Sequence, residues 1–557
     1  MNRREAEFQA IAARGSFPVV ILGGGINGIG LFRELALHGV DCLLLDKSDF
    51  AAGATSNSSR MIHGGLRYLE NGEFGLVRES LRERNRLLAN APHYVAPLRT
   101  TIPIFGWLDG IVRSPLVFLG LPVRPGGRGA LIVKGGLAFY DFVTRARRRT
   151  PRHFFNLRGA ALRALPRLNP GIVAAATYWD ASITQAERLC LELIRDARAL
   201  NPQSRALNYA TAEEVRGGAL VVRDGISGTA CAVAPRVVVN AAGAWVDAAN
   251  ARLGLSTHLI GGTKGSHLVV DSAELHAAIG DRMVYYEHRD GRVCIAFTFM
   301  GKVIMGSTDI RVDDPETAAC DAEEERYIRE SLAGVFPGIR VAREQIVRRF
   351  CGVRPLPAGA ERTTGRISRG HSLEFAEPDT GRPFPVVSLI GGKWTTFRAF
   401  AEQTADRVLP LLGAARRGTT EDMPIGGGRG FPAGAEEKGR WIERTAAARG
   451  MSPARVEVLL ARYGARAEEY CAWPEARGER PLASLPTYTD AEIRWIAAGE
   501  QVERLSDLVC RRSVIALLGD ARPEALAELA AAAGEALGWP PARREEEAAR
   551  TLRETAV

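Results

Sequence analysis

The sequence lacks any uninterrupted apolar window of about 18–20 residues, the length that a membrane-spanning helix requires. Its N-terminal segment, MNRREAEFQAIAARG, has no apolar core of the kind that a secretory signal contains. We therefore expect no spanning helix and no secretion signal, and any contact with a membrane should be peripheral.

Cysteine pairs at metal-binding or redox spacing are also missing. None of the eight cysteines forms a C-x-x-C pair, and their irregular spacing is typical of buried thiols in a reducing cytosol. We expect neither a disulfide framework nor a metal site. Zinc-finger spacing, basic-zipper heptads and the aromatic pattern of RNA-recognition modules are absent as well, so we expect no nucleic-acid partner.

What the sequence does have is positive charge and a globular composition. The 557 residues carry a net charge of +9, mostly as arginine, which favours acidic partners such as phosphorylated metabolites or anionic lipid. Apolar residues make up 46% and charged residues 25%, as in soluble globular proteins. The chain is too long for one compact core, so we expect two or three domains.

A glycine-rich motif stands near the start of the chain. Gly23, Gly25 and Gly28 form G-x-G-x-x-G, which allows a tight turn, close approach of backbone to a pyrophosphate, and packing of helix on strand. Asp46 follows the next apolar run and can accept ribose hydroxyls. The pattern predicts a dinucleotide site; the alternative is a glycine-rich turn beside a solvated acid. The expected elements are a strand at 17–22, a turn at 23–30, a helix at 31–38 and a strand at 40–45.

A second glycine-rich element, LIGGKWTTFR, lies far along the chain and contains Gly391 and Gly392. Two such elements suit a flavin dinucleotide held at both ends, whereas NAD enzymes continue with further strand–helix repeats. A helix that starts near Thr395 and Thr396 could direct its dipole at the isoalloxazine and stabilise the reduced anion. An ordinary capped helix is the alternative.

Between the two elements, VVVNAAGAW predicts a strand that ends at Ala242 and Gly243, as in flavoproteins with a dinucleotide fold. Its alternative is any buried strand with a tight exit. The rest of the pattern predicts further elements. We expect helices at 74–91 and 184–200, strands at 218–223, 229–233 and 236–240, a second sheet within 258–310, and C-terminal helices at 434–470, 490–518 and 522–555.

Several segments together resemble the FAD-dependent, quinone-linked sn-glycerol-3-phosphate dehydrogenases. They occur in the family's order over roughly residues 17–410, and the IHGGLRYLE block is the most specific. The segments are GGGINGIG, ATSNSSRMIHGGLRYLENGEFGLVRESLRERNRLL, KGSHLVVD, GSTDI, CGVRPL and LIGGKWTTFRAFAEQ. Two departures are Trp394, where a smaller apolar residue is usual, and Phe397, where tyrosine is common.

The resemblance implies an α/β fold: a glutathione-reductase-like, FAD-binding Rossmann domain with an inserted mixed β-sheet substrate domain and a C-terminal α-helical domain. It also implies oxidation of sn-glycerol 3-phosphate to dihydroxyacetone phosphate, with electrons passing through FAD to a membrane quinone. The expected boundaries are 16–100, 165–255 and 350–412 for the FAD-binding domain, 101–164 and 256–349 for the substrate domain, 413–433 for a linker, and 434–557 for the helical domain.

The resemblance also assigns residues to roles. It places Arg67, Tyr68, Arg354, Arg369 and Lys393 at the substrate, where guanidinium groups suit a phosphate dianion. A base must take the hydroxyl proton, and His63 and His267 are candidates beside Arg354; a structural role for either histidine stays open. The residues expected to hold FAD are Gly23, Gly25, Gly28, Asp46, Thr55, Ser56, Ser59, His63, Gly64, Gly65, Ala242, Gly243, Gly391, Gly392, Lys393, Thr395 and Thr396.

Residues 106–152 combine apolar runs with a basic cluster. From Arg124 to Arg152 there are eight lysines and arginines but only one acidic residue, Asp141. Apolar surface rimmed by positive charge predicts peripheral docking on the anionic inner face of the cytoplasmic membrane. The alternative is a substrate-domain segment with a solvated basic face.

Three other functions remain open at this point. An oxidase would pass the electrons from the same substrate to O₂, and a related amine, amino-acid or hydroxy-acid oxidoreductase would need a carboxylate site. A catalytically silent flavin sensor would lack the arginines named above. The oligomeric state, a homodimer among the options, is also open.

Overall fold

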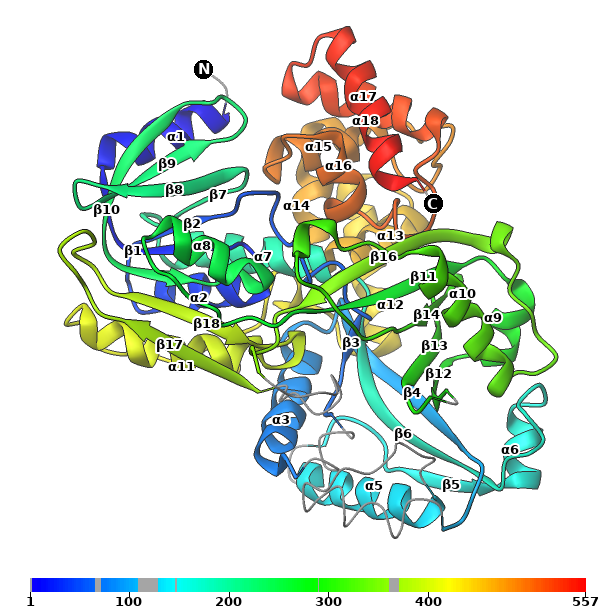
Figure 1. Ribbon diagram of the computed structural model, residues 1–557. Coiled ribbons are helices and arrows are strands. Elements are labelled where there is room, and N and C mark those ends of the chain that lie inside the picture. Colours follow the sequence, from blue (N-terminus) through cyan, green and yellow to red (C-terminus); the bar gives the residue numbers. More distant parts are fainter. Residues whose placement is uncertain are drawn as a thin grey trace.

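The computed structural model describes residues 3–65, 72–108, 129–145, 148–288, 290–359 and 370–556. Two sheets and a set of C-terminal helices make up this part of the chain (Figure 1). An N-terminal helix, α1 (Arg3–Arg14), precedes the first strand.

The first sheet has eight strands, and its centre is parallel. Apolar runs such as VVIL and CLLL are buried on both faces, as expected for parallel strands covered by helices. The order is β17 (His371–Ala376), β18 (Val386–Gly391), β10 (Ala230–Asn240), β1 (Ser16–Leu22), β2 (Cys42–Leu45) and β7 (Arg205–Leu207), with β9 (Ala219–Asp224) on β10 and β8 (Ala210–Arg216) on β9.

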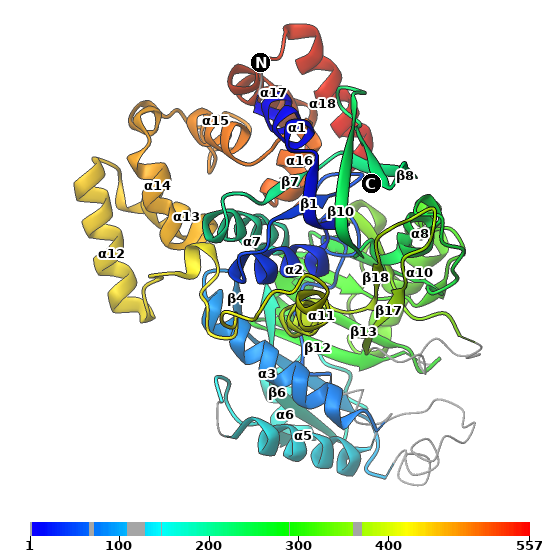
Figure 2. The same cartoon turned by 90° about the vertical axis from the view of Figure 1, so that its left-hand side faces the viewer.

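Three helices cover one face of this sheet: α2 (Ile26–Leu37), α7 (Ala186–Leu200) and α11 (Phe397–Leu411). Figures 1 and 2 agree in placing α2 between the other two, where Ile29 and Phe32 are fully buried. A short helix, α8 (Val246–Arg252), follows β10. The core of this domain therefore forms around α2, the helix that the glycine motif opens.

The second sheet has ten strands and is mainly antiparallel. Helices α9 (Ala273–Ile279) and α10 (Ala322–Ser331) contribute to the hydrophobic core on one of its faces, and α3 (Phe74–Asn90) and α5 (Ala130–Thr144) contribute to a core with β6. The order is β15 (Ile310–Arg311), β11 (Thr263–Val270), β14 (Lys302–Gly306), β13 (Val293–Phe299), β12 (Arg282–Glu287), β4 (Val95–Ile104), β6 (Ala174–Ile183) and β3 (Met61–Ile62), with β16 (Ile346–Arg354) on β11 and β5 (Phe154–Leu157) on β6.

The C-terminal part is helical and has its own cores. It lies against the end of the first sheet that carries β7 and β8 (Figure 1). Its main helices are α12 (Gly434–Arg449), α13 (Pro453–Tyr463), α14 (Ala467–Ala472), α15 (Asp490–Gly499), α17 (Pro523–Leu537) and α18 (Pro541–Thr555), with the short turns α16 (Leu505–Asp507) and η12 (Leu508–Arg512) between them.

The structure confirms the fold class and corrects some of its details. Helix α2 begins at Ile26, so Gly28 and Gly30 lie inside the helix rather than in the turn at 23–30. Residues 230–240 form one strand, not two. Strands β4 and β6 pair within the second sheet, although most of their residues fall inside the segments expected for the FAD-binding domain.

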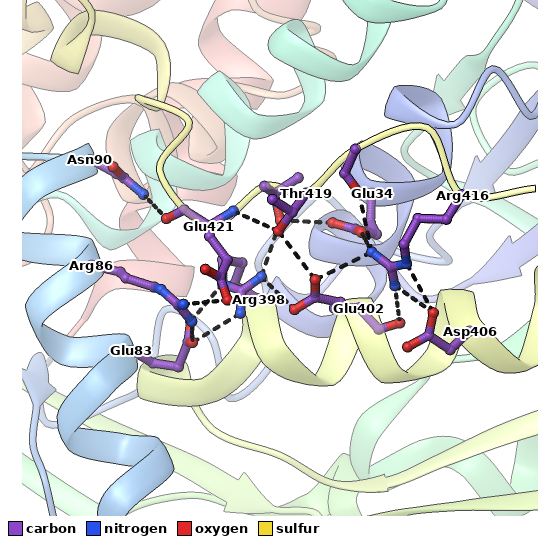
Figure 3. A network of polar contacts seen from close by, with 12 residues as sticks. Glu34, Glu83, Arg86, Asn90, Arg398, Glu402, Asp406, Arg416, Thr419 and Glu421 are labelled. Atoms are coloured by element: carbon purple, nitrogen blue, oxygen red, sulfur yellow. Dashed lines mark hydrogen bonds and ion pairs between the residues drawn. The ribbon is translucent and has the colours of Figure 1, made fainter.

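A buried network of charged side chains fixes α11 to its neighbours (Figure 3). Arg398 of α11 donates to both carboxylate oxygens of Glu83 on α3, at 2.8 and 2.9 Å. Arg416, from the expected linker, pairs with Glu34 of α2 and with Glu402 of α11. The predicted linker at 413–433 is therefore tied to the FAD-binding domain by side chains.

Replacing Glu83 by glutamine is expected to destabilise the protein by about 3 kcal/mol, because it leaves buried guanidinium groups without a full counter-charge. The side chain of Glu83 is only 2% exposed. Urea unfolding measures the loss. The matched control is Glu436→Gln, which removes an exposed pair with Arg440 on α12 and should change stability by less than about 0.5 kcal/mol. Equal losses in the two variants would contradict the prediction.

Candidate active site

The predicted cofactor residues gather at one edge of the first sheet. Strands β1, β2, β10 and β18 run parallel, and Leu22 lies in register with Leu45 and Asn240. The segments that follow these strands therefore begin side by side. In open α/β sheets this edge is where ligands bind.

Two glycines, one in the turn after β1 and one in the first turn of α2, have no room for a side chain. Gly23 has a φ of +111°, and a Cβ there would lie 2.5 Å from the carbonyl oxygen of Ala241. A Cβ on Gly28 would lie 2.0 Å from the carbonyl oxygen of Gly23. Gly25 caps α2 and has no side chain that could accept a hydrogen bond, so the first-turn N–H groups beyond Ile26, whose N–H donates to Thr55, can face a phosphate.

Asp46 closes the neighbouring strand and holds the turn. Its Oδ2 accepts the N–H of Gly24 at 2.6 Å, and its Oδ1 accepts the N–H of Ser48 at 2.7 Å. Burial raises the pKa of Asp46 to about 7, although the two N–H donors act in the opposite direction. A part-buried carboxylate that two N–H groups hold in place is well suited to accept hydroxyl groups of a ribose.

The second glycine-rich element meets the first. Gly391 and Gly392 have φ values of +75° and +86°, and the carbonyl of Gly391 accepts a hydrogen bond from the Asn27 side chain at 3.3 Å. In the described part of the chain, Asn27 Oδ1 and Thr396 Oγ1 are buried without a hydrogen-bond partner. These two atoms are free to bind a polar ligand between the two elements.

The loop at 54–65 contacts both glycine-rich elements, and we call these three segments together the cofactor cradle. Thr55 Oγ1 accepts the N–H of Ile26 at 3.0 Å, and the carbonyl of Thr55 accepts from the Trp394 indole at 2.8 Å. Thr395 Oγ1 lies 3.2 Å from both the N–H and the carbonyl of His63. The larger side chain at Trp394, a departure from the family pattern, therefore ties the loop to the second glycine-rich element.

The remaining predicted cofactor residues lie along the same segments. The Ser56 hydroxyl donates to the carbonyl of Gly53, and Ser59 is part-buried in the same loop. Ala242 and Gly243 follow β10, where Gly243 has a φ of +60°. The nearby positions Gly64 and Gly65 follow His63, and Gly65 has a φ of +76°.

Arg354 stands at the end of β16, where the second sheet approaches this cradle. Its guanidinium contacts Asp309 Oδ1 at 3.1 Å and Ser307 Oγ at 3.4 Å. A Cβ on Gly352, two residues earlier, would lie 2.4 Å from the carbonyl oxygen of Asn57 in the 54–65 loop. The Arg354 side chain is 27% exposed, so it can reach a ligand between the two sheets.

His267 lies on β11, the strand that pairs with β16, and is almost fully buried. Its ring stacks on Phe350 with centroids 5.0 Å apart. Neither ring nitrogen makes a well-formed hydrogen bond with a described residue, although the backbone of Gly265 is close. Burial, and to a smaller extent Arg354, lower the pKa of His267 to about 3, so the imidazole is neutral at physiological pH.

Lys393 is placed by α3: its Nζ donates to Ser80 Oγ at 3.0 Å. Arg67, Tyr68 and Arg369 lie outside the described residues. Their assignment to the substrate stays a prediction.

Some site residues were not foreseen. Asn27 carries a buried oxygen without a hydrogen-bond partner beside the glycine-rich elements, and Asp309 pairs with Arg354. Gly64 donates its N–H to the Tyr140 hydroxyl and to Asp180 Oδ1, at 2.9 and 3.0 Å. Asp309 stands in the GSTDI segment and could have been singled out there, but nothing in the sequence joins Tyr140 to Asp180.

Two family models match this chain. The family model described as FAD dependent oxidoreductase matches residues 18–407, and the model described as the C-terminal domain of alpha-glycerophosphate oxidase matches residues 418–544. A glycerol-3-phosphate dehydrogenase of Synechocystis sp. is 32% identical over 94% of this chain and 93% of its own length. Glycerol-3-phosphate dehydrogenase 2 of Mycobacterium tuberculosis is 30% identical over 94% of this chain and 85% of its own.

The fold has a solved counterpart. The structure of the glycerol-3-phosphate dehydrogenase from Bacillus halodurans, complexed with FAD, covers 98% of this chain and 96% of its own with a TM-score of 0.75 at 23% identity. FAD is the cofactor of this family, and the glycine turn, Asp46 and the unpartnered oxygens of Asn27 and Thr396 fit it. The chain belongs to the FAD-dependent glycerol-3-phosphate dehydrogenase family.

Proposed function

We propose that this protein oxidises sn-glycerol 3-phosphate to dihydroxyacetone phosphate and passes the electrons to a membrane quinone. The observation that carries the proposal is Arg354, a part-exposed guanidinium at the point where the second sheet meets the cofactor cradle. A guanidinium suits a phosphorylated substrate. Bound FAD supplies the hydride acceptor. The similar proteins named glycerol-3-phosphate dehydrogenase support the choice of substrate.

The experiment is an anaerobic reduction. Adding sn-glycerol 3-phosphate to the FAD-loaded protein should bleach the flavin band, and a quinone analogue should restore it. Glycerol without phosphate is the control and should leave the band unchanged. A flavin that no phosphorylated polyol bleaches would contradict the proposal.

A second candidate is an oxidase that reduces O₂ to peroxide with the same substrate. It is favoured by the match of residues 418–544 to a domain of alpha-glycerophosphate oxidase. The two functions differ in the acceptor alone. Peroxide formed at the rate of substrate oxidation in air would identify the oxidase, and fast dye or quinone reduction with little peroxide would identify the dehydrogenase.

Replacing Arg354 by methionine is expected to lower kcat/KM about 30-fold, because a charge-assisted hydrogen bond of about 2 kcal/mol is lost. The FAD content should not change. Arg349→Met is the matched control: Arg349 lies on the same strand, is 24% exposed, and pairs with Glu325 rather than facing Asp309. Equal losses in the two variants would remove Arg354 from the substrate site.

We also propose that His63 accepts the proton from the substrate hydroxyl. A base is most effective when its pKa lies near the working pH, and His267, with a pKa of about 3, is a weak acceptor. His63 lies near the end of the 54–65 loop, where its backbone N–H and carbonyl contact Thr395 Oγ1. In this proposal His267 is a neutral, buried group that takes no part in the proton transfer.

Docking on an anionic membrane surface is the remaining part of the proposal. Phe142 and Leu131 of α5 are 58% and 54% exposed, and Trp107 nearby is 49% exposed. Within the described residues, no helix is long and apolar enough to cross a bilayer. A groove of about 1010 Å³ lies between α3 and α5, and its charged lining consists of six arginines, Arg78, Arg82, Arg86, Arg145, Arg148 and Arg149, and two acids, Glu421 and Asp422. Exposed apolar side chains beside clustered arginines favour peripheral binding.

The double variant Arg145→Glu/Arg149→Glu is expected to weaken binding to anionic liposomes at least ~30-fold, because each basic side chain near the surface contributes about 1 kcal/mol. Liposome flotation at low salt measures it. The control is the double variant Arg440→Glu/Arg444→Glu, which reverses the charge of two side chains that are 66% and 69% exposed on α12 in the helical domain. A native protein that does not float with anionic liposomes would refute membrane docking.

A further inference from the structure

The short segment after β2 is fixed by the C-terminal domain. Three residues beyond Asp46, the carboxylate of Asp49 is 1% exposed. Arg512 donates to both of its oxygens, with Nη2 at 2.9 Å from Oδ1, and Arg511 donates to Oδ2. Two arginines from the end of the chain thus contact one carboxylate beside the ribose-binding position.

The arginines are themselves held by the helical domain. Arg512 donates to the carbonyls of Glu500 and Gln501, each at 3.0 Å, and Arg511 donates to Asp507 Oδ1 at 2.8 Å. Asp507 in turn accepts the N–H groups of Glu503 and Arg504. The guanidinium groups are therefore oriented before they meet Asp49.

The same segment is held from its other side by the first sheet. The N–H of Tyr209 donates to the carbonyl of Ser48 and the N–H of Ala210 donates to the carbonyl of Asp46, both at 2.7 Å. The Tyr209 hydroxyl donates to Asp507 Oδ1 at 2.5 Å. Backbone and side chain of the 46–49 segment are thus joined to one network.

Charge explains why this contact is strong. Arg512 and Arg511 hold the pKa of Asp49 well below its usual range, against the opposing effect of burial. A fully buried carboxylate is stable only while its partners remain in place. Movement of either arginine would therefore disturb the segment that presents Asp46.

We propose that the C-terminal helical domain sets the affinity for FAD, with Arg512 as a positioning residue that holds Asp49 and thereby keeps Asp46 in place for the adenosine ribose. The proposal rests on the assignment of Asp46 to the ribose. It gives the helical domain a role at the cofactor, although the domain itself lies outside the cradle.

The test compares two arginine-to-lysine variants as apoproteins, with FAD binding followed by flavin fluorescence. Arg512→Lys keeps the charge but loses the bidentate fork, and its Kd for FAD should rise about 10-fold. Its kcat at saturating FAD should stay within about twofold of native. Arg455→Lys is the control, because Arg455 is a part-buried arginine that pairs with Glu479 and Glu492 in the same domain and makes no contact with Asp49. Its Kd for FAD should not change.

A folded Arg512→Lys protein with native FAD affinity overturns the proposal, as does an equal rise in Kd for both variants. A measurement on the native chain covers the case in which Arg512→Lys does not fold. FAD binding should slow amide hydrogen exchange in residues 500–515 as well as in 23–65, because coupling between sites is reciprocal. Protection confined to 23–65 would overturn it too. Asp46→Asn tests the ribose role separately, since native affinity in that variant would refute the role of Asp46 whatever Arg512 does.

Discussion

Replacing His63 by glutamine is expected to lower kcat about 100- to 10,000-fold while the protein retains FAD, because the substrate hydroxyl then lacks its proton acceptor. In the native protein, kcat should fall as the pH is lowered and the base takes up a proton. The sign follows from the role, because a general base acts only when it is deprotonated. The variant should lose this pH dependence along with most of its rate.

His267 provides the comparison. If it were the acceptor, the acid limb of kcat would lie near its pKa of about 3, and the rate would stay constant down to about pH 5. In our proposal, His267→Gln lowers kcat less than His63→Gln does and leaves the acid limb in place. Stopped-flow reduction of the flavin at saturating substrate measures both. A native profile that is flat to about pH 5 would assign the proton to another group.

The part of the fold that the sequence predicted is the part set by local signals. The apolar run FPVVIL, the glycine turn and the run VDCLLL became β1, the turn and β2 because each is determined within a few residues. The start of α2 was placed too late because Gly28 was interpreted as a turn residue. In the structure it is helical, and its missing side chain serves packing against Gly23.

The pairing of strands that lie far apart in the sequence could not be predicted from such local signals. No strand was predicted at β4 or β6, because both are buried along most of their length and lack the alternation of buried and exposed residues that marks a half-buried strand. Buried charges are harder still. Arg511 and Arg512 stand in a sequence that resembles a solvated helix, and only the fold shows that they reach Asp49. Family resemblance supplied roles for Arg354 and Lys393 that residue patterns alone did not.

Replacing Gly28 by alanine is expected to weaken FAD binding about 100-fold or more, which corresponds to about 3 kcal/mol of forced displacement. The added Cβ would lie 2.0 Å from the carbonyl oxygen of Gly23, and that oxygen belongs to backbone that no side-chain rotation can move. The turn must therefore shift away from α2, which moves the N–H groups that we expect to face the pyrophosphate. Titration of the apoprotein with FAD measures the loss.

The control is Gly439→Ala in α12, where the new Cβ meets nothing within 4 Å. This change should leave the affinity for FAD unaltered and stabilise the helix by up to about 1 kcal/mol, since alanine favours helix more than glycine does. Gly25→Ala covers the case in which Gly28→Ala does not fold. Its Cβ would meet only Thr55 Oγ1, at 3.3 Å, so the chain can adjust. The methyl group then lies at the N-terminus of α2, where phosphate is expected, and FAD should bind more weakly. Native affinity in a folded Gly25→Ala or Gly28→Ala protein would mean that the pyrophosphate does not approach this turn.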